Sequence, residues 1–138
     1  MDKEKVIATL NSILELELAG VVRSMHYSLM IFGWNRIPIV QWFRDESTES
    51  LQHAAKAGEY ITSLGGHPSL KIGELLETHQ HDIDTMLGEL TEHENEGIRL
   101  YRELLALVEG KDIRMEEYAR SMILSEEDHL DEIDKMLR

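Results

Sequence analysis

Four long segments of the chain carry apolar residues at steps of three and four, which is the spacing of one buried face on an α-helix. The pattern predicts helices over residues 3–32, 39–64, 82–109 and 112–137. Helix-stopping residues separate these segments: Gly33 with Pro38, the run Gly65-Gly66-His67-Pro68, and Gly110. No segment shows the alternation of a half-buried strand, so we expect an all-α four-helix bundle.

The connections between the predicted helices differ in length. Short turns join the first helix to the second and the third to the fourth, so each of these pairs is expected to lie antiparallel. Residues 65–81 can extend over roughly 55 Å, which exceeds the roughly 40 Å length of one such helix. This segment can span the whole bundle, and the sequence therefore predicts one long crossover between the second and third helices.

Composition and charge exclude several classes of protein. The chain of 138 residues has no cysteine, which rules out disulfides, thiolate metal sites and cysteine nucleophiles. Its net charge of −13, without a basic cluster, does not suit a nucleic-acid-binding protein. It shows neither a secretory signal nor an apolar run long enough for a transmembrane helix, so no membrane partner is expected. We expect one domain over residues 1–138, located in the cytoplasm.

Carboxylates and imidazoles fall among the apolar positions of all four predicted helices. Glu17, His53 and Glu94 lie within the first, second and third helices. The fourth carries Glu126 and His129, which are three residues apart and therefore share one face of the helix. Buried charges need a partner, and carboxylate oxygen together with imidazole nitrogen is a ligand set that iron accepts. The sequence thus predicts that these five residues bind metal.

The second helix departs from the pattern at one position. A second Glu-x-x-His pair is expected there, but Ser50 stands three residues before the histidine. Glu49 is rotated about 40° from that histidine, on the side away from Ser50, and Glu46 lies nearer the inward face but two turns away. Both are weaker candidate ligands, and neither restores the missing bridge. His79 and His81, in the crossover segment, are expected to be polar surface residues.

Several separated motifs, in the right order, resemble bacterioferritin over nearly the whole chain. They are Leu10-Asn11, Glu17-Leu18, Phe43-Arg44-Asp45-Glu46-Ser47, His53-Ala54, Leu64-Gly65-Gly66-His67-Pro68, Tyr101-Arg102-Glu103 and Glu126-Glu127-Asp128-His129. The resemblance implies a ferritin-like bundle that oxidises Fe(II) with O₂ at a di-iron centre and stores iron inside a cage of many subunits. It further implies that Glu17 and His53 hold one iron. Glu94 and His129 would hold the other, with Glu126 as a bridge.

The chain differs from the family at three places. Ser50 replaces the second bridging glutamate. Leu51 stands where the family carries its haem-binding methionine, and because leucine cannot ligate iron we predict no haem b. The family's short fifth helix, which helps to close the cage, does not follow the fourth predicted helix. A homo-oligomer is therefore expected, with a dimer favoured over a larger cage.

These observations lead to two functional hypotheses. In the first, the chain binds two iron ions per subunit, or one, and oxidises Fe(II) with O₂ or peroxide in iron storage. In the second, it is a non-catalytic iron-binding or structural subunit with a degenerate site, which partners other ferritin-like chains. Ser50 is the feature that favours the second hypothesis.

Overall fold

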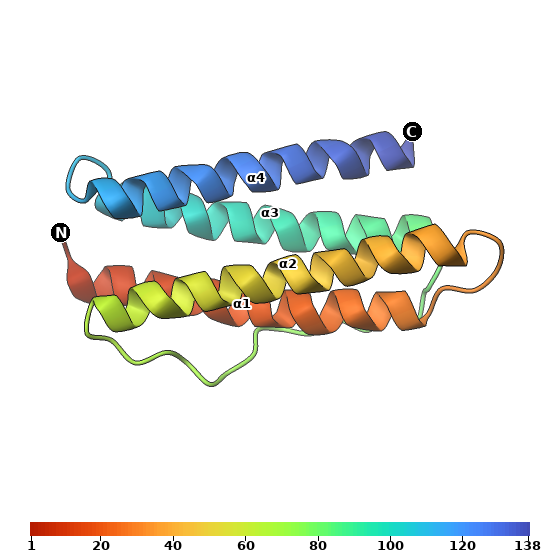
Figure 1. Ribbon diagram of the computed structural model, residues 1–138, viewed down its shortest axis with the longest axis horizontal. Helices are drawn as coiled ribbons and strands as arrows, with labels where there is room; N and C mark the ends of the chain where they lie inside the picture. Colours follow the sequence, from red (N-terminus) through yellow and green to blue (C-terminus); the bar gives the residue numbers. More distant parts are fainter.

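The computed structural model describes residues 1–138 as four α-helices without strands (Figure 1). The helices are α1 (Lys3–Leu29), α2 (Arg36–Ser63), α3 (Ile83–Val108) and α4 (Ile113–Leu137). An aspartate caps the start of α1, α3 and α4, and its side chain accepts a hydrogen bond from the backbone N–H three residues later. The all-α fold predicted from the sequence is confirmed.

The turn between α1 and α2 differs from the prediction. The sequence predicts a helix to residue 32 and another from residue 39, whereas α1 ends at Leu29 and α2 begins at Arg36. Pro38 therefore lies in the first turn of α2, where a backbone N–H has no intrahelical acceptor and its absence costs nothing. Gly33 adopts a φ of 96° in the turn, and Arg36 Nη1 donates a hydrogen bond to the Ile31 carbonyl oxygen at 2.7 Å. The proline thus belongs to the second helix and does not end the first.

The crossover, residues 64–82, runs from one end of the bundle to the other (Figure 1). Short turns make antiparallel hairpins of α1 with α2 and of α3 with α4. Because the crossover carries the chain back along the bundle, α2 and α3 run in the same direction. The predicted long crossover is confirmed. None of the four helices combines the length and the apolarity that crossing a membrane requires.

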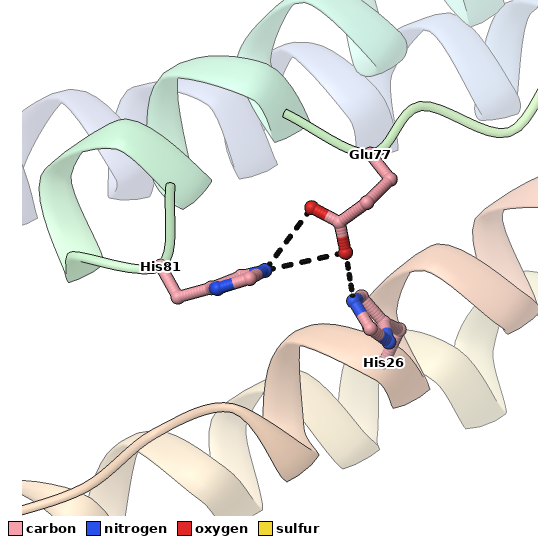
Figure 2. Close-up of side chains that lie close together, drawn as sticks. All are labelled: His26, Glu77 and His81. Atoms are coloured by element: carbon pink, nitrogen blue, oxygen red, sulfur yellow. Dashed lines mark hydrogen bonds and ion pairs between the residues drawn. The ribbon is translucent and has the colours of Figure 1, made fainter. Parts of the chain in front are cut away.

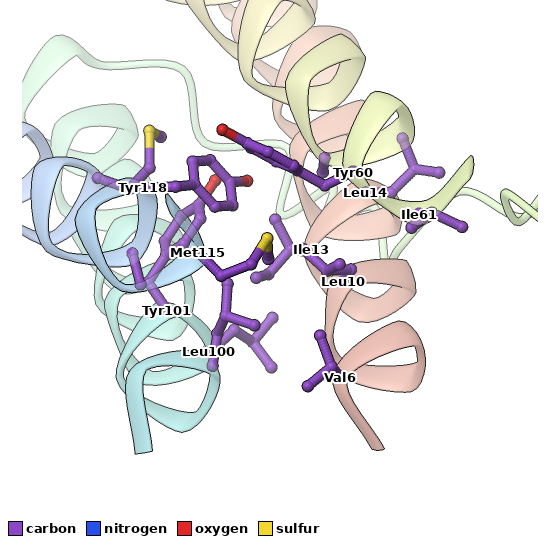
Figure 3. Close-up of a cluster of buried hydrophobic side chains, with 14 of the residues drawn as sticks. Val6, Leu10, Ile13, Leu14, Tyr60, Ile61, Leu100, Tyr101, Met115 and Tyr118 are labelled. Atoms are coloured by element: carbon purple, nitrogen blue, oxygen red, sulfur yellow. The ribbon is translucent and has the colours of Figure 1, made fainter. Parts of the chain in front are cut away.

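The apolar side chains form two clusters, one toward each end of the bundle. The larger cluster draws on all four helices and includes the buried residues Leu10, Ile61, Tyr101 and Met115 (Figure 3). The smaller cluster includes Tyr27, Phe43, Met86 and Ile133. Between these clusters each helix carries buried or partly buried polar side chains. A polar layer therefore interrupts the apolar core near the middle of the bundle.

The crossover packs closely on α1 at Gly73. The Gly73 N–H donates a hydrogen bond to the Glu15 carbonyl oxygen at 2.8 Å, and a Cβ added to Gly73 would lie 2.8 Å from the same oxygen. Because this neighbour is backbone, no side chain can move to relieve the contact. We expect Gly73→Ala to displace the crossover locally and to lower the free energy of unfolding by about 1–3 kcal/mol, as measured by urea denaturation.

Gly88 on α3 offers the matched control. A Cβ added there meets no atom within 4 Å. Gly88→Ala should therefore be neutral, or should stabilise the chain by up to about 1 kcal/mol because alanine favours a helix more than glycine does. Equal changes in stability for the two variants would contradict the close packing at Gly73.

Candidate metal centre

Six ionisable side chains from all four helices meet in the polar layer. They are Glu17 of α1, Glu46 and His53 of α2, Glu94 of α3, and Glu126 and His129 of α4. Residues three or seven apart on a helix share a face at different heights, which brings both residues of α2 and both of α4 to the bundle centre. The side chains form two groups of three, and within each group one donor atom per residue lies within 4.8 Å of the others.

The first group contains Glu17, His53 and Glu126. The Nδ1 atom of His53 lies 3.1 Å from Glu17 Oε2 and 3.5 Å from Glu126 Oε1. Both glutamates are buried, and the histidine side chain is only 16% exposed. Glu49 lies at the edge of this group, with Oε1 3.6 Å from His53 Nε2, but its side chain is 46% exposed. Glu49 is therefore a partly solvated neighbour of the group, not a buried member.

The second group contains Glu46, Glu94 and His129. The Nε2 atom of His129 lies 2.6 Å from Glu46 Oε1, and its Nδ1 atom lies 3.5 Å from Glu94 Oε1. Despite the short distance to Glu46, the buried Nε2 atom makes no hydrogen bond of acceptable geometry. Both glutamates are buried. The sequence predicts Glu46 only as a weaker candidate ligand, whereas the structure places it directly beside His129.

Burial and charge act against each other in both groups. Loss of solvation raises the pKa of Glu17 and of Glu46 above its ordinary value, although the neighbouring histidine offsets part of this rise. Burial alone lowers the pKa of His129, but the nearby carboxylates of Glu46 and Glu94 outweigh it and raise the pKa to about 10. Burial likewise lowers the pKa of His53, but Glu17, together with the charges of Glu49 and Glu94, outweighs it and raises the pKa. Each group therefore favours a positive charge at its centre.

The donor set fits a pair of divalent cations. Each group offers two carboxylates and one imidazole, which are ligands for first-row transition metals such as iron. Two divalent cations would balance the charge of the four buried carboxylates. A metal ion would also satisfy the buried His129 nitrogen that lacks a hydrogen bond. All five residues that the sequence predicts as ligands lie in these two groups.

Ser50 lies between the two groups along α2. It is one turn after Glu46 and nearly one turn before His53. A Cβ added to Gly20 of α1 would lie 3.0 Å from both Ser50 Oγ and His93 Nε2, so the missing glycine side chain makes room for these polar atoms. The position where the resemblance implies a bridging carboxylate therefore carries an uncharged hydroxyl, and Glu46 supplies the fourth buried carboxylate.

Two aromatic side chains border the polar layer. Trp42 stacks on His129, with ring centroids 5.6 Å apart and an angle of 17° between the planes. Tyr101 is fully buried, and burial, together with the charge of Glu17, raises the pKa of its hydroxyl well above the ordinary value. The tyrosine thus stays protonated beside the carboxylates. In the sequence Trp42 is one of the apolar residues of the second predicted helix. The spacing along that helix does not predict its contact with His129 of α4.

Comparisons with known proteins place the chain in a family. A sequence model of the ferritin-like domain matches residues 7–138. The chain belongs to the ferritin-like family. One relative of this ferritin-like protein is the bacterioferritin of Rhodobacter capsulatus, which is 30% identical over 128 residues. The aligned region covers 92% of this chain and 79% of that bacterioferritin.

Solved structures of other ferritin-like proteins share the bundle. A ferritin-like, diiron-carboxylate protein from Bacillus anthracis str. Ames has a TM-score of 0.90 and 25% identity, covering 100% of this chain and 99% of that one. Rhodobacter capsulatus bacterioferritin, solved with a metal-free dinuclear site and haem iron, has a TM-score of 0.88 and 28% identity over 97% and 84% of the two chains. The dodecameric thioferritin of Bacteroides fragilis shares the fold, with a TM-score of 0.89 and 22% identity. The match covers 99% of this chain and 86% of that one.

Proposed function

We propose that this ferritin-like chain binds two iron ions per subunit in the polar layer and oxidises Fe(II) there as part of iron storage. One ion would be held by Glu17, His53 and Glu126, and the other by Glu46, Glu94 and His129. The observation that carries the proposal is the burial of four carboxylates beside two partly buried imidazoles, in two groups of matching composition. The likeness to a bacterioferritin and to a diiron-carboxylate protein supports it. Fe(II) and O₂ or peroxide are then the substrates.

The buried side chains suit this chemistry. Their carboxylates favour the more highly charged Fe(III), because negative charges act more strongly in a poorly solvated site than in water. Cation binding displaces protons from His53 and His129, whose pKa values are raised by the nearby glutamates. Each Fe(II) gives up one electron, so two ions supply the two electrons that reduce O₂ and two protons to hydrogen peroxide. Glu126 and His129 lie one turn apart on α4, which keeps the two groups adjacent.

Anaerobic titration with Fe(II), followed by desalting and exposure to air, tests the proposal. We expect the wild-type chain to retain two Fe(II) ions. Glu94→Ala and His129→Ala should lose iron from the second group, because each removes a ligand from the polar layer. Glu92→Ala, which changes an exposed glutamate of the same helix, should retain the wild-type amount. The proposal fails if the wild type retains no iron, or if Glu94→Ala and His129→Ala retain as much as the wild type.

Ser50 favours a second candidate function, that of a non-catalytic iron-binding or structural subunit that partners other ferritin-like chains. An uncharged side chain between the two groups removes one carboxylate from the space where an oxidant would meet both ions. The same titration separates the two functions. Bound Fe(II) that O₂ and peroxide oxidise no faster than free Fe(II) would assign the chain to the second one.

The proposal includes assembly of identical chains. Val22, Met25 and Leu29 are exposed on α1 and, together with Ser47 of α2, line a shallow apolar groove of about 400 Å³. A contiguous apolar surface of this kind is typical of an interaction site, and a two-fold dimer is the smallest assembly that buries it on both partners. The related protein from Bacteroides fragilis is described as a dodecamer. The cytoplasm is the proposed location.

A further inference from the structure

A third group of metal-binding side-chain types lies outside the polar layer, where the crossover passes α1 (Figure 2). The Nε2 atom of His26, on α1, lies 2.6 Å from Glu77 Oε2. The Nε2 atom of His81 lies 3.1 Å from Glu77 Oε1 and 3.3 Å from Oε2. The sequence predicts His81 as a polar surface residue, but its side chain is only 20% exposed and points at the glutamate. Two imidazoles and one carboxylate therefore converge from segments far apart in the sequence.

This donor set is that of a zinc site with an open position. Zinc bonds of about 2.0–2.1 Å place the donor atoms of a tetrahedral site roughly 3.3 Å apart. The contacts of His81 with Glu77 already have this spacing. The shorter contact from His26 must open by about 0.7 Å to admit a metal ion between the two side chains. In the single chain His26 and Glu77 are 41% and 37% exposed, so a hydrated ion can reach the group.

The backbone of the crossover holds Glu77 in position. The His79 N–H donates a hydrogen bond to Glu77 Oε1 at 2.5 Å. His79 has a φ of 58°, a left-handed conformation that residues other than glycine seldom adopt. This N–H bond, together with the contacts from His26 and His81, holds the Glu77 carboxylate in place. The turn at His79 thus positions the carboxylate between two imidazoles.

We propose that His26, Glu77 and His81 bind one divalent transition-metal ion of the zinc type, which fastens the crossover to α1. The site is separate from the polar layer and does not depend on the function proposed for it. Gly73 already docks the middle of the crossover through its backbone bond to Glu15. The ion fastens the following segment, residues 74–82. Metal–ligand bonds then take the place of hydrogen bonds that water can break.

Zinc titration of the full chain by calorimetry tests this site. We expect His26→Ala and His81→Ala to bind one Zn(II) fewer per chain than the wild type, or to bind it at least about 100-fold more weakly. Loss of a residue that only hydrogen-bonds to a metal ligand already weakens metal sites about 10–100-fold. His67→Ala removes an exposed histidine from the same crossover and should bind zinc like the wild type. Unchanged zinc binding in both variants, or an equal loss in His67→Ala, overturns the proposal.

Hydrogen exchange provides a second readout that a surface ion pair would not reproduce. Zn(II) should slow amide exchange over residues 74–82 in the wild type, and this effect should be absent from His26→Ala. Exchange that zinc leaves unchanged in the wild type contradicts the fastening role. Iron retention in the polar layer should be equal in His26→Ala and the wild type, because none of its ligands is altered. Failure of the zinc site therefore leaves the proposed iron function intact, and the reverse also holds.

Discussion

Glu46→Ala should remove one of the two proposed iron ions and weaken iron binding in the second group by at least about 100-fold. Glu46 is 8% exposed, and its Oε1 atom lies 2.6 Å from His129 Nε2, so the substitution leaves that group with one carboxylate and one imidazole. The first group keeps all its ligands. Anaerobic Fe(II) titration combined with Mössbauer spectroscopy would count the ions that remain and distinguish their environments.

Glu49→Ala is the matched control, since it removes the same side chain from the same helix three residues later. Glu49 is 46% exposed and lies 3.6 Å from His53, so we expect iron binding to weaken by less than about tenfold. Equal losses in the two variants would show that burial and closeness to a histidine do not identify the ligand here.

Fe(II) should raise the thermal stability of the chain by a large amount under argon. A ligand that binds only the folded state at 100 times its dissociation constant stabilises that state by about 2.7 kcal/mol per site, so two sites give about 5 kcal/mol. For a chain of 138 residues this corresponds to a rise in Tm of roughly 15–20 °C. The physical reason is that the ions neutralise the four carboxylates that folding removes from water.

Differential scanning calorimetry with and without a chelator measures this rise. In Glu46→Ala the rise should be about half that of the wild type, because only one group of ligands remains complete. A wild-type Tm that does not respond to saturating Fe(II) would mean that the polar layer is a hydrogen-bonded network without a cation.

The bundle could be predicted because the buried face of each helix appears in its own sequence as apolar residues at steps of three and four. Apolar periodicity located all four helices, and the run from Gly65 to Pro68 marked the start of the crossover. The pattern misplaces the boundary near Pro38, because a proline that ends one helix and a proline in the first turn of the next look alike in sequence. The first residue of α2 depends on how Gly33 turns the chain, and the spacing of apolar residues does not encode that turn.

The sequence also identified most of the candidate site, because residues three apart on one helix must share a face. The sequence understates Glu46 because, along α2 alone, seven residues separate it from His53 by roughly 10 Å. His129 of α4 lies at the height of Glu46 and not at that of His53, a relation that only the packing of two helices reveals. The same limit concealed the contact between His26 and Glu77, which depends on the path of the crossover.

The stacking of Trp42 on His129 supplies an optical signal for iron in the polar layer. Indole emission is quenched by a redox-active ion a few ångströms away, and His129 belongs to the second group. The other tryptophan, Trp34, is fully exposed in the turn before α2 and contributes a constant background. Loss of Trp42 fluorescence would therefore report iron binding in the polar layer without a label, and most strongly beside Glu46 and Glu94.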